Sequence, residues 1–244
     1  MAKFAKIIQK NNENLLIEKF IRLLNTKIQN NGKKRFSFVL TGGNSPIKLY
    51  KKLAKNKYIK WKNVDFFIGD ERFVKETSKN SNINMCRKYL LNKIKITNNQ
   101  IYKISTINKS IMENASNYEK KIKKYFLNKK VVFDLVLLGI GNDGHIASLF
   151  KKYINKKNNK NVIFVKRKDF YRITLTLECL NNSKSIFLWA PGKSKSNIIK
   201  KIILDNKFKY PASFLKKKII FYSTVTDFAK FLGLSISQFL SEAT

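Results

Sequence analysis

The single histidine of the chain, His145, is the residue best suited to move a proton near neutral pH. It follows a glycine-rich segment, residues 139–144, which comes directly after a buried strand expected at 131–138. We expect a helix to begin at His145, and a helix N-terminus disfavours the charged imidazolium. A neutral imidazole can accept a proton from water. The sequence therefore presents His145 as a candidate general base, beside the plainer alternative of a structural histidine.

A second segment, residues 41–46, could bind a phosphate group. Its two glycines separate a strand expected at 36–40 from a helix, for which Ser45 is a suitable cap and Pro46 fits the first turn. Glycines allow the backbone to approach a ligand, and the helix start offers free N–H groups and partial positive charge. The alternative is an ordinary tight turn between a strand and a helix.

A third segment, residues 69–72, follows a strand expected at 64–68 and reads Gly-Asp-Glu-Arg. Asp70 could bind a sugar hydroxyl, and Arg72 could bind a phosphate through its planar fork of donors. The alternative is a surface ion pair, which contributes little to stability.

Strand-like and helix-like stretches alternate along the chain, which is typical of a mainly parallel sheet. Further strands are expected at 162–165, 173–177, 185–190 and 218–222, and helices near 81–91, 112–126 and 194–204. Residues 151–161 are polar and read as a mobile surface loop. We therefore predict an α/β fold, a three-layer, Rossmann-like sheet with helices on both faces, in a single domain spanning residues 1–244. Ligands bind beyond the carboxyl ends of such strands, where the three segments fall.

The formal net charge of +36 raises the alternative of a basic nucleic-acid-binding protein. Lysine is spread along the whole chain, and there are only six arginines, although arginine is the usual reader of nucleic acids. We interpret the charge as a compositional bias towards Lys, Asn and Ile, and expect no specific nucleic-acid partner.

Composition also restricts where the protein can work. Hydrophobic residues make up 43% of the chain, but no apolar run approaches the roughly 20 residues that a membrane-spanning helix needs. No secretory signal is visible, and Cys86 and Cys179 do not form a C-x-x-C pair. We expect a cytoplasmic protein with no membrane association.

Several other chemistries are excluded or disfavoured by motif. Residues 139–144 spell G-x-G-x-x-G, but this segment lies far from the first strand–helix unit and is crowded by Asp143 and His145, which disfavours a dinucleotide site. One histidine cannot supply a multi-histidine metal site, and neither a nucleophile elbow nor a P-loop is present.

In their order along the chain, these segments resemble the family of 6-phosphogluconolactonases and glucosamine-6-phosphate deaminases. The most specific part is Asp-Gly-His-Ile-Ala-Ser-Leu-Phe at residues 143–150, supported by residues 69–72. The deaminase branch typically has a tyrosine at the position of Arg72 and a glutamate shortly after the Gly-His element. Residues 147–151 contain no acid, which favours the lactonase branch, although Lys151 stands where lactonases usually have proline.

The resemblance implies hydrolysis of 6-phospho-D-glucono-1,5-lactone to 6-phosphogluconate, the second step of the pentose phosphate pathway, without a cofactor or metal. His145 would be the general base, and either Asp143 or Asp70 would orient it or hold sugar hydroxyls. The substrate phosphate would bind Gly42, Gly43, Asn44, Ser45, Arg72 and Arg172, with Lys193 as a further cation. The family also suggests a monomer or weak dimer. The alternatives are a deaminase or sugar-phosphate isomerase on the same fold and a sugar-phosphate-binding regulator without activity.

Overall fold

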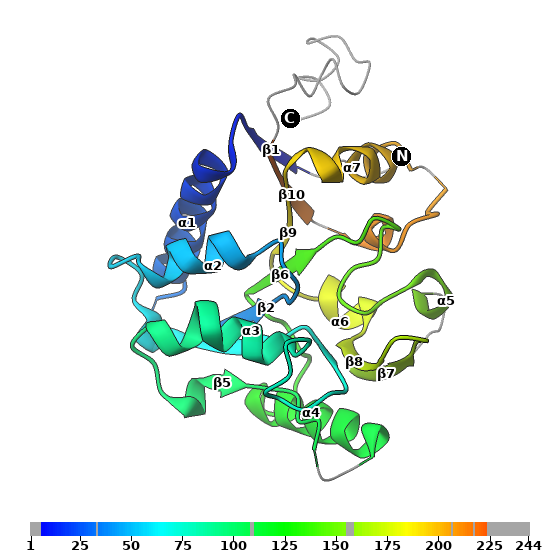
Figure 1. Ribbon diagram of the computed structural model, residues 1–244. Coiled ribbons are helices and arrows are strands. Elements are labelled where there is room, and N and C mark those ends of the chain that lie inside the picture. The colour runs from blue at the N-terminus through cyan, green and yellow to red at the C-terminus, as the bar shows by residue number, and fades with distance from the viewer. Residues whose placement is uncertain are drawn as a thin grey trace.

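The centre of the molecule is a seven-stranded parallel sheet with the order β1-β10-β9-β6-β2-β3-β5 (Figure 1). The computed structural model describes residues 6–32, 34–107, 110–154, 159–205, 207–216 and 218–223. The strands of this sheet are β1 (Lys6–Lys10), β2 (Phe36–Leu40), β3 (Val64–Ile68), β5 (Ile101–Tyr102), β6 (Leu135–Gly139), β9 (Ile186–Pro191) and β10 (Lys218–Ser223). All their pairings are parallel, which confirms the predicted sheet.

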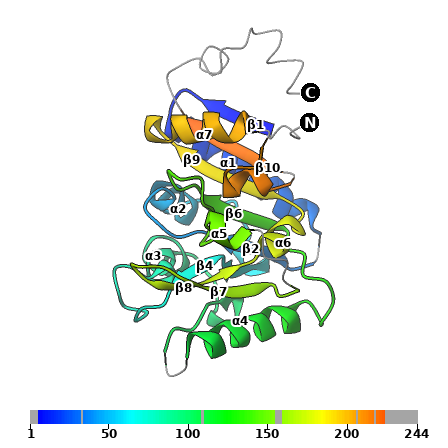
Figure 2. The ribbon, with the colours of Figure 1, turned by 90° about the vertical axis from the view of Figure 1, so that its right-hand side faces the viewer.

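Helices cover both faces of the sheet and complete the three layers (Figures 1 and 2). On one face lie α1 (Glu13–Asn30), α2 (Ile47–Ala54) and α3 (Asn82–Tyr89), and on the other α4 (Ile111–Tyr125), α6 (Leu177–Asn181) and α7 (Ser196–Ile203). The short helix α5 (Lys151–Ile154) and single 3₁₀ turns at Trp61–Asn63, Leu91–Lys93, Asn98–Gln100, Lys193–Lys195 and Pro211–Phe214 lie in connections. None of the helices in the described residues is long and apolar enough to cross a membrane.

The order of the strands creates a crevice between β2 and β6. From β2 the chain crosses through α2 to β3, whereas from β6 it crosses on the opposite face towards β9. Neighbouring strands whose connections leave in opposite directions open a ligand-binding crevice at their carboxyl ends. The segments after β2 and β6 are those that carry Gly42 and His145.

A second sheet of three antiparallel strands lies beside the first (Figure 2). It has the order β4 (Asp70–Arg72), β8 (Tyr171–Leu175) and β7 (Val162–Lys166). The sequence pattern did not separate these strands from the main sheet, because a strand pattern does not reveal its partner. Residues 70–72, which we expected only to follow the strand at 64–68, form a strand of their own, β4.

The core is built from strands buried on both faces, as their continuous apolar runs predict. Every residue of β2 and β3 is buried. Phe20 of α1 packs edge-on against Phe187, Trp189 and Phe221, with ring centroids 5.3–5.7 Å apart. Each such pair contributes about 0.5–1.5 kcal/mol beyond burial of its area, so α1 is firmly held against β9 and β10.

Buried polar contacts explain where one predicted strand was misplaced. We expected a strand from 131, but β6 begins at Leu135. The exception in the apolar run, Asp134, accepts hydrogen bonds of 2.8 Å from both the backbone N–H and the hydroxyl of Ser37, and one of 2.6 Å from Lys184. This carboxylate joins the start of β6 to β2 and ends the irregular segment before the strand.

Three other expectations about local structure were wrong. β8 ends at Leu175, and Thr176 caps α6 instead of continuing the strand. The N-cap of α2 is Pro46, without a side-chain cap, so Ser45 does not cap this helix. Residues 151–154 of the expected loop form α5, while 155–158 lie outside the described residues.

Candidate active site

A cavity of about 140 Å³ lies at the carboxyl ends of β2 and β6. Seven of the residues singled out from the sequence line it: Gly42, Gly43, Ser45, Asp70, Arg72, His145 and Arg172. The other lining residues are Thr41, Asn82, Gly139, Ile140, Gly141 and Ala147. Three segments that are far apart in the sequence therefore meet at one site.

A buried tyrosine of α2, Tyr50, holds the start of the glycine turn after β2 through its backbone. The hydroxyl of Tyr50 donates to the carbonyl of Thr41 at 2.8 Å and accepts from its N–H at 3.1 Å. Burial holds the pKa of Tyr50 well above its ordinary value, so this hydroxyl stays protonated. The side-chain oxygen of Thr41 accepts from the N–H of Gly139 at 3.1 Å, which joins the turns after β2 and β6.

Both glycines of this turn are required by its geometry. Gly43 has a φ of 81°, in the left-handed region that glycine adopts without strain. A Cβ at Gly42 would overlap the side chain of Asn82, which is buried beside the cavity. Asn44 is exposed and does not line the cavity, and the carbonyl of Ser45 accepts a hydrogen bond from Trp189.

Arg72 and Arg172 are directly paired in the β4–β8 ladder. Like charges opposite each other in a ladder repel, so this pair favours an anion between the two guanidinium groups. Arg72 donates through Nη1 to the carbonyl of Asn80 at 2.9 Å, and Arg172 donates through Nη2 to Asp169 at 2.5 Å. The buried Nε of Arg172 has no acceptor among the described residues, which leaves a donor for a ligand.

His145 is paired with Asp143, one of the two acids considered for this role. Its Nδ1 lies 2.5 Å from Oδ1 of Asp143, and its backbone N–H donates to the same oxygen at 3.2 Å. Partial burial works to raise the pKa of Asp143, but the hydrogen bonds and charge of His145 outweigh it and lower that pKa. An ionised Asp143 holds the proton on Nδ1, so Nε2 is the nitrogen left to accept a proton.

The helix expected at His145 is absent from the described structure of this segment. Residues 141–145 form a turn in which the N–H of Gly144 donates to the carbonyl of Gly141 at 2.9 Å, and the next helix, α5, begins at Lys151. Gly144 has a φ of 79°, which interrupts any continuous helical path into His145. Contrary to our expectation, no helix N-terminus in the described segment therefore acts on the imidazole of His145.

Asp70 lines the same cavity but is oriented by different groups. Its side chain accepts a hydrogen bond of 2.6 Å from Ser148, and its carbonyl accepts one of 2.7 Å from Asn82. No hydrogen bond joins Asp70 to His145 in the described part of the chain. The geometry therefore favours Asp143 as the orienting acid and leaves Asp70 to face the ligand.

Glu71 is a buried acid that sequence reasoning left without a role. It accepts hydrogen bonds from the N–H groups of Arg72, Asn82 and Ile83 and from the hydroxyl of Ser81. Burial raises its pKa to about 7, although the backbone N–H donors favour its charged form. Glu71 thus fastens the start of α3, and with it Asn82, to β4.

Lys195 lies closer to the histidine turn than the expected Lys193. The ammonium of Lys195 donates to the side chain of Asn142 at 2.9 Å, and burial lowers its pKa despite the attraction of Asp143. Lys193 is exposed, and neither lysine is among the residues that line the cavity. Both residues follow β9 in the same short 3₁₀ turn, so the sequence pattern alone could not choose between them.

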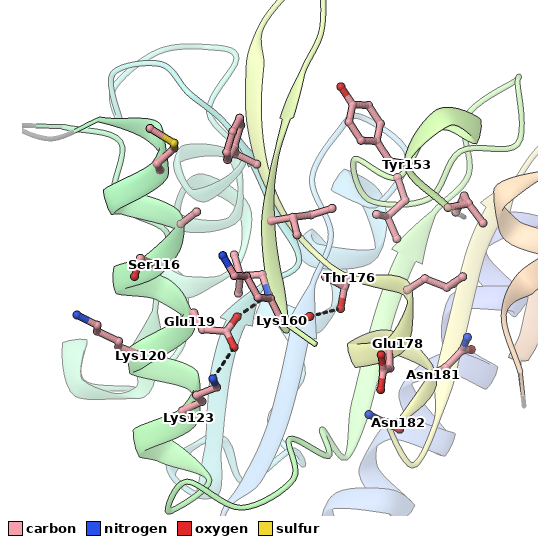
Figure 3. Close-up of a pocket in the computed structure, with 18 of the residues that line it drawn as sticks. Ser116, Glu119, Lys120, Lys123, Tyr153, Lys160, Thr176, Glu178, Asn181 and Asn182 are labelled. Carbon is pink, nitrogen blue, oxygen red and sulfur yellow. Dashed lines mark hydrogen bonds and ion pairs between the residues drawn. The ribbon is translucent and has the colours of Figure 1, made fainter. Parts of the chain in front are cut away.

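A larger groove of about 1190 Å³ lies away from these residues, between α4, the β7–β8 hairpin and α6 (Figure 3). Glu119 joins α4 to β7 in the wall of this groove, because it accepts hydrogen bonds from the N–H of Val162 at 2.7 Å and from the side chain of Asn161 at 3.0 Å. None of the site residues predicted from the sequence lines this groove. Across the described ranges, no three His, Cys, Asp or Glu side chains gather as a metal site would require.

Comparison with known proteins identifies the family. The sequence model of one protein family, described as glucosamine-6-phosphate isomerases/6-phosphogluconolactonase, matches residues 11–222 of the chain. The chain belongs to this family. It is 32% identical over 188 residues to the 6-phosphogluconolactonase of Thermotoga maritima, covering 76% of this chain and 82% of the relative. It is 31% identical over 213 residues to the 6-phosphogluconolactonase of Synechocystis, covering 84% and 88%.

Solved structures of the family share the fold. The crystal structure of the Thermotoga maritima 6-phosphogluconolactonase has a TM-score of 0.79 and 29% identity, covering 90% of this chain and 99% of that one. The 6-phosphogluconolactonase from Trypanosoma cruzi has a TM-score of 0.82 and 27% identity, covering 94% and 97%. A monomeric glucosamine-6-phosphate deaminase, at 18% identity and a TM-score of 0.76, shares the fold alone.

Proposed function

We propose that this protein hydrolyses 6-phospho-D-glucono-1,5-lactone to 6-phosphogluconate. The observation that carries the proposal is one cavity lined by His145, which is paired with Asp143 outside the lining, and by the facing arginines Arg72 and Arg172. The first pair suits proton transfer, and the second suits a phosphate. Relatives named 6-phosphogluconolactonase at 31–32% identity support this assignment.

Phosphate binding places the lactone for reaction. Arg72, Arg172 and the N–H groups of the turn at 42–45 bind the phosphate oxygens, since guanidinium forks and free backbone donors match that geometry. Lys195 offers a further cation beside the histidine turn. Binding energy gained at the remote phosphate then positions the lactone carbonyl beside His145.

Hydrolysis proceeds by base-assisted attack of water. Nε2 of His145 takes a proton from water as the water oxygen bonds to C1 of the lactone, giving a tetrahedral oxyanion. The ammonium of Lys195, which lies beside the histidine turn, stabilises the oxyanion. The bond from C1 to the ring oxygen breaks, and that oxygen takes the proton from His145. The new carboxylic acid loses its proton to solvent, and Asp143 stabilises the imidazolium throughout the cycle.

The decisive experiment follows lactone hydrolysis above its spontaneous rate, with the substrate generated in situ. His145→Ala should lower kcat by about 10²–10⁴-fold, the range that general acid–base catalysis supplies, with little change in phosphate binding. A wild-type protein that does not accelerate hydrolysis would contradict the lactonase proposal. Glucosamine 6-phosphate is then the next substrate to test, because the family includes deaminases.

The wider setting of the protein belongs to the same proposal. We infer one α/β domain over residues 1–244, acting as a monomer or weak dimer in the cytoplasm, with no specific nucleic-acid partner. Burial raises the pKa of the Cys86 and Cys179 thiols well above the ordinary value, so neither is a reactive thiolate at neutral pH. Such inert, unpaired thiols suit a reducing compartment.

A further inference from the structure

A tight turn places Phe150 directly beside His145. Ile146 and Leu149 form an antiparallel bridge, closed by a 2.8 Å hydrogen bond from the N–H of Leu149 to the carbonyl of Ile146. Ala147, inside the turn, has a φ of 47°, a left-handed conformation that costs a non-glycine residue about 1 kcal/mol. The residues flanking a bridged pair are the next to face each other, so His145 and Phe150 become neighbours.

The ring of Phe150 contacts both the base and a cation. Its centroid lies 4.5 Å from that of His145, with the planes tilted by 35°. The guanidinium carbon of Arg167 lies over the same ring at 4.0 Å. The ring therefore contacts both the imidazole of His145 and the guanidinium of Arg167. The side chain of Phe150 is 7% exposed and therefore has little freedom to move.

The same ring also approaches the arginine assigned to the phosphate. The guanidinium carbon of Arg172 lies 5.7 Å from the centroid of Phe150. Asp169 holds both cations, with contacts of 2.5 Å to Nη2 of Arg172 and 3.6 Å to Nε of Arg167. One aromatic ring and one carboxylate thus fix two guanidinium groups relative to the imidazole.

We propose that Phe150 is a positioning residue that sets the separation between His145 and Arg172. The inference rests on the proposed function, because it assumes that Arg172 binds the phosphate and that His145 activates water. With both groups in contact with one buried ring, a bound phosphate places the lactone carbonyl at a fixed distance from Nε2. Through the ring, binding of the phosphate raises kcat for lactone hydrolysis. Phosphorylated lactones are therefore favoured over unphosphorylated ones.

The test compares kcat/KM for 6-phosphogluconolactone and for unphosphorylated glucono-1,5-lactone. The phosphorylated lactone should be strongly preferred by the wild type. Phe150→Leu should lower kcat on it by about 10–100-fold, since a displacement near 1 Å can cost about a hundredfold. Loss on the unphosphorylated lactone should be several-fold smaller, so the preference collapses. Phe150→Tyr, which keeps the ring, should retain both the rate and the preference.

Two further variants separate positioning from general damage. Phe164→Leu, at a half-exposed phenylalanine of β7 away from the cavity, should leave both rates unchanged. Asp169→Asn should weaken the preference for the phosphorylated lactone without altering the core. Circular dichroism and thermal unfolding show whether Phe150→Leu folds, and Asp169→Asn replaces it in the test if it does not.

The outcomes distinguish this inference from the function on which it rests. An unchanged preference in folded Phe150→Leu, whether the two rates fall equally or not at all, would overturn the positioning role. If Phe150→Leu does not fold, an unchanged preference in Asp169→Asn would overturn it. A wild-type protein that hydrolyses neither lactone would overturn the proposed function instead. That measurement needs only the wild-type protein.

Discussion

The small cavity at the ends of β2 and β6 and the large groove beside α4 differ most in how their polar groups are paired. The groove is the larger by far, yet its buried carboxylate, Glu119, already holds the N–H of Val162 and the amide of Asn161. The cavity contains two buried polar atoms, Nε of Arg172 and Oδ1 of Asn82, that no group in the described chain satisfies. Unsatisfied buried groups are costly, so they mark where a ligand is expected better than volume does.

Removing one cation from the cavity gives the sharpest effect on binding. Arg172→Ala should raise KM for 6-phosphogluconolactone by about 10–100-fold, because a hydrogen bond between charged groups contributes about 1.5–3 kcal/mol. kcat should fall as well, because Arg172 also helps to place the lactone carbonyl beside His145, although His145 and Asp143 remain paired. Steady-state kinetics across lactone concentrations measure both constants.

Arg87→Ala is the matched control for this change. Arg87 also pairs with a single carboxylate, Glu76, but lies outside the cavity. Its loss should leave KM unchanged. An equal rise in KM for Arg87→Ala and Arg172→Ala would indicate a general effect of positive charge on the anionic substrate. The cavity would then not be the site that binds the phosphate.

The sequence predicted the three segments of the cavity well, because each is a local pattern that follows a buried strand. It did not predict which residues face one another across long distances, such as Arg72 and Arg172, since that register depends on the pairing of β4 with β8. The turn at 146–149 was also missed, because it depends on a left-handed Ala147 that no residue preference indicates.

Other omissions had a signal that was available. Helix α1 has an Asn12 cap and buried apolar residues at helical spacing: Leu16, Ile17, Phe20, Leu24 and Ile28.

The choice between Lys193 and Lys195 had no signal in the sequence, because both follow the same glycine and only the fold shows which ammonium reaches Asn142.

Glu71 extends the comparison from ligand binding to stability. Burial raises its pKa to about 7, so between its ordinary pKa and pH 7 the folded protein binds this proton more tightly than the unfolded chain does. The resulting stabilisation is complete at low pH and is lost as the pH rises towards 7, with a slope on the order of 1 kcal/mol per pH unit. Above that range the contribution is constant.

Glu71→Gln should remove this slope. Denaturant unfolding at pH 5, 6, 7 and 8 gives the free energy of unfolding of each protein, and the wild type should lose more stability than the variant between pH 5 and 7. Parallel curves for the wild type and Glu71→Gln would show that this carboxyl is ionised throughout.

The smallest effect is expected in the groove itself, where α4 presents Lys120 and Lys123 (Figure 3). The contact of 3.2 Å joins the exposed ammonium of Lys123 to the buried Glu119, and an ion pair with one exposed partner contributes on the order of 1 kcal/mol. Replacing both lysines by alanine should leave kcat/KM within about twofold and lower the thermal midpoint only slightly. A large loss of activity with the fold intact would break the comparison, because the groove would then take part in the reaction despite its satisfied polar groups.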